Sequence, residues 1–147
     1  MELIKNEPKY WEFIRKLRNN NSNESINQEF ITKEKQKKYM KKNGNYFYIC
    51  ILNNIPTGYI RIINNDIGLI VDKNYRRKGI ALFMVKEVMK LNPKAFAKIK
   101  IWNKKSIELF KKAGFKLSNY IYEYAPDLNS RSFNEDSLNK GYEVNQK

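Results

Sequence analysis

The chain has 147 residues, which is enough for one domain that buries more than half of its unfolded surface. Its 29 lysine and arginine residues against 15 acidic residues give a formal net charge of +14. Such a surface attracts anions and opposes the approach of a polycationic substrate such as an aminoglycoside. The chain contains no histidine, which excludes a Ser-His-Asp triad and any histidine-ligated metal, and no metal site is expected.

The single cysteine, Cys50, lies in an alternating apolar run and has no partner for an intramolecular disulfide. We therefore expect a core residue in a reducing compartment. Residues 1–8 are charged, and no apolar run approaches the length of a membrane span. The sequence predicts a cytoplasmic protein without a membrane partner.

The first forty residues predict two helices. Pro8 suits the first turn of a helix over 8–19, in which apolar side chains recur at helical spacing. An Asn/Ser-rich connector over 19–27 follows. Thr32 is expected to cap a second, lysine-rich helix that ends at Gly44.

The middle of the chain predicts an antiparallel meander followed by a crossover. Three short strands, over 45–52, 56–63 and 66–71, are joined by Asn-Asn turns that suit hairpins. An amphipathic helix over 79–91 leads to a further strand over 95–101, which would pair in parallel with the strand over 66–71.

Two motifs carry functional information. The first is the loop Arg-Arg-Lys-Gly-Ile-Ala at 76–81, which enters the helix and so presents unpaired backbone N–H groups and the positive end of the helix dipole to an anion. Its glycine and alanine leave room for phosphate oxygens to approach the backbone. The second is a short helix over 103–115, capped by Asn103 and stopped by Gly114.

Together these motifs resemble the GNAT superfamily of acetyl-CoA-dependent N-acetyltransferases. The phosphate loop of that family has the form Arg/Gln-x-x-Gly-x-Gly/Ala, which Arg76, Gly79 and Ala81 fill. The family also has an Asn-led helix that ends in Gly-Phe, matched here by Asn103 and by Gly114 with the phenylalanine after it. The motifs cover residues 45 to 116, and the first forty residues agree by element order.

The resemblance implies an α+β GNAT fold: a mixed central sheet with an antiparallel meander, followed by a βαβα unit, with helices on both faces. The domain is expected over residues 1–125, before a polar C-terminal tail over 126–147. Tyr120, Tyr122 and Tyr124 alternate just before this tail, as in a last strand. Acetyl-CoA is the implied co-substrate, with its pantetheine arm along the edge of the strand over 66–71. The residues expected to bind it are Leu69, Val71, Arg76, Arg77, Lys78, Gly79, Ile80, Ala81, Asn103 and Ser106.

The implied reaction is direct attack of a primary amine of a small molecule on the thioester, and the basic charge favours an amino sugar on a nucleotide as acceptor. Asp66 is chosen as the general base, although an aspartate after two asparagines is also a common turn residue. The family often has a tyrosine as proton donor where this chain has Phe110, so Tyr120 or Tyr122 would replace it. The substrate contacts considered are Glu29 and Tyr48.

Three other functions remain open from the sequence. A protein N-terminal or lysine acetyltransferase is the first, although Lys98 stands where the branch acting on ribosomal proteins often carries a glutamate. The second is a nucleic-acid-binding module, against which the even spread of basic residues argues. The third is a GNAT-like domain that binds acyl-CoA without catalysis. The expected partners are the amine acceptor and, at most, a second copy of the chain in a homodimer.

Overall fold

The structure, a computed structural model, describes residues 1–21 and 29–126. The chain divides into two compact units, Met1–Lys98 and Ile99–Lys147. Within the described ranges no helix is long and apolar enough to cross a membrane. The first unit contains β1 (Glu2–Lys5), the 3-10 turn η1 (Pro8–Tyr10), α1 (Trp11–Asn20), α2 (Lys33–Asn43), the 3-10 turn η3 (Gly44–Tyr46), β2 (Phe47–Leu52), β3 (Ile55–Ile63), β4 (Asp66–Val71), the 3-10 turn η4 (Lys73–Tyr75) and α3 (Ile80–Leu91); the second contains α4 (Lys104–Lys112).

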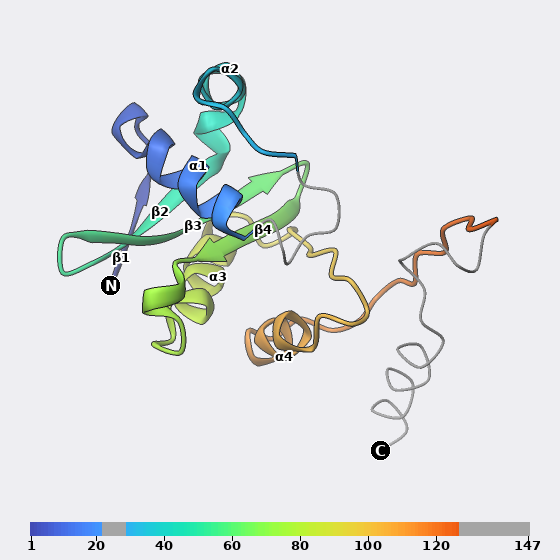
Figure 1. Cartoon of the computed structure of the whole chain (residues 1–147). Coiled ribbons are helices and arrows are strands. Elements are labelled where there is room, and N and C mark those ends of the chain that lie inside the picture. Colours follow the sequence, from blue (N-terminus) through green and yellow to red (C-terminus); the bar gives the residue numbers. More distant parts are fainter. Residues whose placement is uncertain (22–28, 127–147) are drawn as a thin grey trace. The chain divides into compact units, whose positions relative to one another are not determined.

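The first unit is built on an antiparallel sheet of strand order β1-β2-β3-β4 (Figure 1). Both hairpins turn at Asn-Asn pairs with positive φ, 51° and 63° at Asn53 and Asn54, and 52° and 63° at Asn64 and Asn65. Positive φ at both central residues gives a turn whose twist matches that of the strands. The predicted meander is therefore confirmed. β1 was not predicted, because it is only four residues long.

The structure contains both predicted N-terminal helices, but α1 begins at Trp11 and ends at Asn20 instead of spanning 8–19, whereas α2 begins and ends as predicted. α1 follows a 3-10 turn that starts at Pro8, and α2 is capped by Thr32, whose Oγ1 accepts a hydrogen bond from the Lys35 N–H at 3.2 Å. Gly44 is the C-cap of α2.

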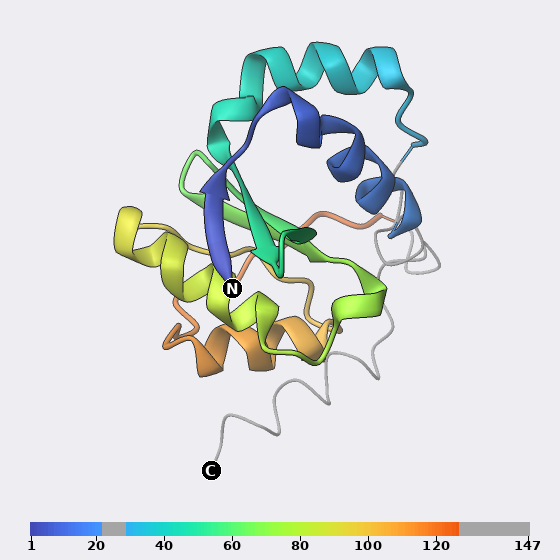
Figure 2. The same ribbon diagram turned by 90° about the vertical axis from the view of Figure 1, so that its left-hand side faces the viewer.

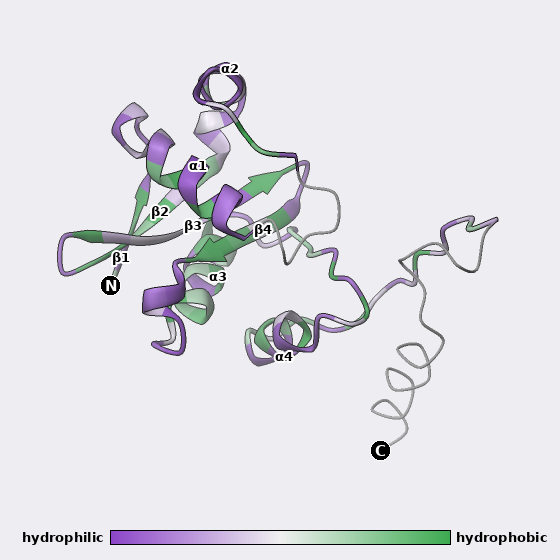
Figure 3. Cartoon of the chain, in the orientation of Figure 1, coloured by the Kyte–Doolittle hydropathy of each residue, from purple (hydrophilic) through white to green (hydrophobic). Residues whose placement is uncertain are grey.

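Helices cover both faces of the sheet. Figure 2 shows α1 and α2 on one side and α3 on the other. Since side chains of a strand alternate between faces, the odd positions of β2 and β3 face α1 and α2, and the even positions of β3 face α3. In Figure 3 the strands are mostly hydrophobic, whereas α2 is largely hydrophilic along its length. The core between the sheet and the first two helices consists of Ile14, Leu17, Met40, Phe47, Ile49 and Tyr59.

The strand expected over 95–101 is wrong apart from one residue. Phe96 forms a parallel bridge with Asp66, in which the Ile67 N–H donates to the Phe96 carbonyl and the Phe96 N–H donates to the Asn65 carbonyl, both at 2.8 Å. In a continued parallel ladder the N–H of Lys98 would be the next to pair with β4, but it donates to the Asp66 side chain at 3.4 Å. A side-chain acceptor thus replaces the next backbone acceptor, and the ladder does not continue.

The last strand expected from the alternating tyrosines 120, 122 and 124 is also absent, since residues 115–125 form no strand. These tyrosines are 59%, 87% and 93% exposed. A period of two in the sequence predicts which side chains would share a face, but a strand forms only where a neighbouring strand accepts its hydrogen bonds.

Candidate functional site

The loop between β4 and α3 has an unusual backbone. Asp72 accepts a hydrogen bond from the Asn74 N–H at 2.9 Å and so begins the short turn η4. After it, Arg77 and Gly79 both adopt left-handed φ angles, 65° and 76°. Only glycine takes this conformation without strain, so Gly79 suits the N-cap of α3 for a backbone reason.

The N–H groups of this loop are available to a ligand. Across the described residues, no acceptor receives a hydrogen bond from the N–H groups of residues 77–82. The first paired N–H is that of Phe83, which donates to the Gly79 carbonyl at 3.0 Å. The Ile80 side chain is buried in the core, so this residue offers its backbone alone. A series of unpaired N–H groups at the start of a helix is an anion-binding arrangement.

The open space at Gly79 supports the same reading. A Cβ placed there would meet no protein atom within 4 Å. The glycine therefore makes no room for other parts of the protein, and the space beside it remains accessible to a bound group.

The basic side chains of the loop are exposed and differ in their partners. The Arg76 guanidinium donates to the Val71 carbonyl at 3.4 Å and to the Asn21 side chain, which ties the loop to the end of α1. Lys78 lies over the Tyr75 ring, with its Nζ 5.1 Å from the ring centroid. Neither Arg77 nor Lys78 pairs with a carboxylate in the parts of the chain that the structure describes.

The edge of β4 leads to this loop. In an antiparallel ladder the backbone groups of alternate residues point toward the same neighbour. Ile67 directs its N–H away from β3 to Phe96, so Leu69 and Val71 direct theirs away from β3 as well. No acceptor within the described ranges binds either N–H. These are the two residues for which main-chain contacts were predicted.

The predicted residues of the second unit have local roles there. Asn103 caps α4, because its Oδ1 accepts a hydrogen bond from the Ser106 N–H at 3.1 Å. Phe110 is buried and meets the ring of Phe115 edge to face, at 5.0 Å between centroids. Tyr120 is largely exposed. The participation of Asn103, Ser106 and Tyr120 in the site stays a prediction.

The other predicted residues do not come together around one point. Asp66 lies at the start of β4, whereas the basic loop follows the other end of that strand. Glu29 is paired with Lys35 at 3.2 Å and is exposed. Tyr48 lies between Phe47 and Ile49, two core residues of β2 that face α1. Since neighbouring side chains of a strand point to opposite faces, Tyr48 lies on the face of the sheet that α3 covers. Their catalytic and substrate-binding roles stay predictions.

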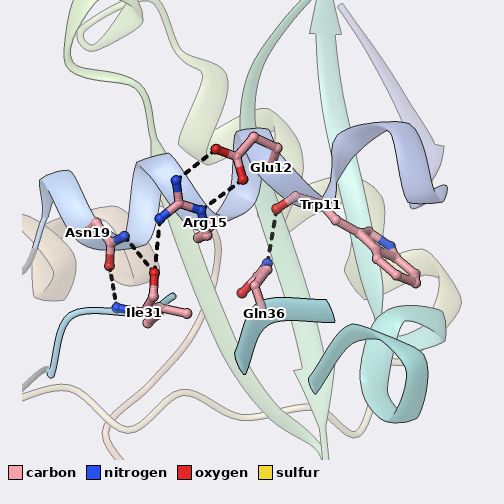
Figure 4. A network of polar contacts seen from close by, with 6 residues as sticks. All are labelled: Trp11, Glu12, Arg15, Asn19, Ile31 and Gln36. Carbon is pink, nitrogen blue, oxygen red and sulfur yellow. Dashed lines mark hydrogen bonds and ion pairs between the residues drawn. The ribbon is translucent and has the colours of Figure 1, made fainter. Parts of the chain in front are cut away.

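A polar network connects α1 with Ile31 and α2, on the face of the sheet opposite to α3 (Figure 4). Asn19 makes two hydrogen bonds with the backbone of Ile31, at 2.9 and 3.1 Å. Arg15 donates to the same carbonyl at 2.9 Å and pairs with both oxygens of Glu12, at 2.7 and 2.8 Å. The hydrogen bond from Arg15 lowers the pKa of Glu12. Gln36 is buried and donates to the Trp11 carbonyl at 3.0 Å.

Arg18, Tyr59 and Arg61 form a second polar group, which was not predicted from the sequence. Tyr59 is 5% exposed, and burial raises its pKa to about 12, while Arg18 and Arg61 act in the opposite direction. Arg61 was not predicted as a site residue. The sequence feature that could have indicated Arg61 is its charge at an odd position of β3, on the face toward α1 and α2, in a strand that is otherwise mostly apolar.

Comparison with known proteins agrees with this geometry. Residues 11–115 match the model of the acetyltransferase (GNAT) family. No curated protein matches the chain. Among solved structures, a ribosomal-protein-alanine N-acetyltransferase from Brucella melitensis has a TM-score of 0.69 at 14% identity, covering 79% of this chain and 85% of that one.

Two further structures have the same fold. A GNAT-family acetyltransferase from Bacillus anthracis has a TM-score of 0.68 at 23% identity, with 84% of each chain covered. A protein from Salmonella typhimurium, solved with its cofactor acetyl-CoA, has a TM-score of 0.68 at 14% identity, with 80% of each chain covered. The chain belongs to the acetyltransferase (GNAT) family and is an acetyl-CoA-dependent N-acetyltransferase.

Proposed function

We propose that this protein transfers the acetyl group of acetyl-CoA to a primary amine of a small molecule. The observation that supports this best is continuity along the backbone: the outward N–H groups of Leu69 and Val71 on β4 and those of residues 77–82 follow one another, and no described residue accepts from either set. Acetyl-CoA has the matching chemistry in the same order, with amide groups in its pantetheine arm and a pyrophosphate beyond them. The thioester supplies an acetyl group activated toward an amine.

The residues of the chain bind and orient this co-substrate. The backbone groups of Leu69 and Val71 pair with the amides of the arm, which holds it extended along β4. The loop N–H groups and the start of α3 bind the pyrophosphate, while Arg77 and Lys78 add positive charge. Because most of these contacts are made by the backbone, the affinity depends more on the shape of the loop than on particular side chains.

A pair of glycine variants tests the proposal. Gly79 and Gly114 both have positive φ, and a Cβ at either position would meet nothing within 4 Å. Gly79→Glu and Gly114→Glu therefore introduce similar backbone strain and the same charge. We expect Gly79→Glu to weaken acetyl-CoA binding by at least about tenfold in calorimetry, because its carboxylate lies against the pyrophosphate.

Gly114→Glu is the matched control and should bind acetyl-CoA as the wild type does. Thermal unfolding of both variants checks that they are folded. The proposal is wrong if the wild-type protein does not bind acetyl-CoA, or if the two variants lose affinity equally.

A further inference from the structure

A second group of basic residues, Arg18 and Arg61, has no carboxylate partner within the described residues. Arg15 and Arg18 are one turn apart on α1, and Arg15 is paired with Glu12. Arg18 instead lies over the Tyr39 ring, with its Cζ 5.2 Å from the centroid, and meets the Gln36 Oε1 at 3.5 Å. Within the described residues no carboxylate lies within ion-pair distance of Arg18 or Arg61.

Two residues of α2 contact the Arg18 side chain. The side-chain oxygen of Gln36 faces Arg18, and its nitrogen donates to the Trp11 carbonyl. Tyr39 supplies the ring on which the guanidinium rests. A guanidinium stacked in this way keeps most of its N–H groups free to donate to another partner.

The Arg61 side chain packs against β4. It pairs across the strands with Gly68, and a Cβ at position 68 would lie 2.9 Å from the Cζ, Nε and Nη2 atoms of Arg61. The guanidinium thus lies directly over the glycine. Any larger residue at this position would displace it.

Tyr59 lies close to both arginines. It is two residues before Arg61 on the same face of β3. Its ring is 5.4 Å from that of Phe47, which in turn is 6.3 Å from the Tyr39 ring on which Arg18 rests. The hydroxyl makes no hydrogen bond with any residue in the described parts of the chain. Apart from the contact of Arg18 with Gln36, the phenol and the two guanidinium groups have no acceptor for their donors among the described residues.

The position of this group relates it to the proposed reaction. Tyr59 and Arg61 are the cross-strand partners of Ile70 and Gly68, which flank Leu69 on β4. The group therefore lies on the α1 and α2 face of the sheet, next to the strand along which the pantetheine arm is proposed to run.

From this arrangement we infer that the amine acceptor carries an anionic group, a carboxylate or a phosphate, which Arg18, Arg61 and Tyr59 bind. The inference rests on the proposed function, since it assigns the class of acceptor for the same reaction. Two guanidinium groups and a phenol provide donors suited to oxygen anions. A neutral or cationic amine would leave the two positive charges uncompensated.

Kinetics with matched amines tests the inference. Glucosamine 6-phosphate is compared with glucosamine, and an α-amino acid with its amide, so that each pair differs in one anionic group. We expect the wild type to prefer one acidic member, with the preferred pair distinguishing phosphate from carboxylate. Arg18→Gln and Arg61→Gln should each raise KM for that member by about tenfold to a hundredfold, with kcat less affected. Lys38→Gln and Lys41→Gln are the controls, because they remove the same charge from exposed positions of α2.

A binding measurement keeps the test independent of turnover. Inorganic phosphate and acetate are titrated into the 15N-labelled protein, with and without saturating CoA, and the side-chain Nε–H signals are followed by NMR. Saturable shifts at Arg18 and Arg61 that persist with CoA bound, and that Gly68→Ala weakens, support the inference. Equal reactivity of both members of each pair, or no saturable shift at either arginine, overturns it. Failure of CoA to bind would contradict the proposed function instead, and the anion titration without CoA would still test the binding of anions by Arg18 and Arg61.

Discussion

At the scale of single residues, the surroundings decide what a charged or polar group does. Arg15 and Arg18 are the same residue type one turn apart, but Arg15 pairs with Glu12 and donates to the Ile31 carbonyl, whereas Arg18 has no carboxylate partner in the described residues. Cys50 is fully buried, and burial raises the pKa of its thiol. This agrees with the predicted core role, since a buried neutral thiol is a poor nucleophile.

Tyr59 provides a prediction for the alkaline range. Burial raises its pKa from 10.0 to about 12, so the neutral phenol is stabilised in the folded state. This contribution is complete below about pH 10 and is lost as the pH rises toward 12. Two pKa units correspond to about 3 kcal/mol. We expect the unfolding free energy of Tyr59→Phe to fall less than that of the wild type between about pH 9 and 11.5, as measured by urea unfolding.

The control is Tyr122→Phe, at a position 87% exposed. It should keep the pH dependence of the wild type. The same slope in the wild type and Tyr59→Phe would show that Tyr59 titrates normally.

At the scale of elements, β4 combines two functions in alternate residues. Its even positions pair with β3 and hold the sheet together, whereas its odd positions direct their backbone groups outward. The strand therefore forms part of the fold on one side and, on the other, presents the edge that is proposed to bind the pantetheine arm.

Proline substitutions separate these two functions. Ile70→Pro removes a donor from the ladder with β3 and is expected to lower the unfolding free energy by about 3 kcal/mol or more. Leu69→Pro removes an N–H that no described residue accepts, so it should cost less stability. It should, however, weaken acetyl-CoA binding in calorimetry. Equal stability losses, or an unchanged affinity in Leu69→Pro, would contradict the assignment of the outward edge.

At the scale of the whole molecule, the charge of +14 creates a field that favours anionic ligands. The loop proposed to bind the pyrophosphate and the Arg18–Arg61 pair proposed to bind the acceptor lie within that field. Exposed charges are screened beyond about 10 Å at 0.1 M salt, so the long-range part depends on ionic strength.

Salt dependence measures this contribution. The affinity for acetyl-CoA is expected to fall roughly tenfold as NaCl rises from about 0.05 to 0.5 M. Acetyl-pantetheine lacks the phosphates, so its affinity should change little over the same range. Parallel salt dependence of the two compounds would show that the loop charges do not act on the phosphates.

The local features of the fold could be predicted from the sequence. The two Asn-Asn turns, the Thr32 cap and the glycine at the start of α3 each follow from conformational preferences within a few residues. The basic loop over 76–81 could be found for the same reason, since its residues are contiguous, and its role in binding phosphate stays a prediction. The strands over 95–101 and 120–124 were wrong, because alternation alone supplies no partner for the backbone.

What the sequence by itself determined is therefore the chemistry carried by short contiguous segments: the meander, the basic loop and the helix that follows it. Only the tertiary structure placed Arg18 from α1, Arg61 from β3 and Gly68 from β4 on the same face of the sheet. These residues are up to fifty positions apart, and their proximity depends on strand register and helix packing. Those in turn arise from the burial of the whole core, which no local pattern contains.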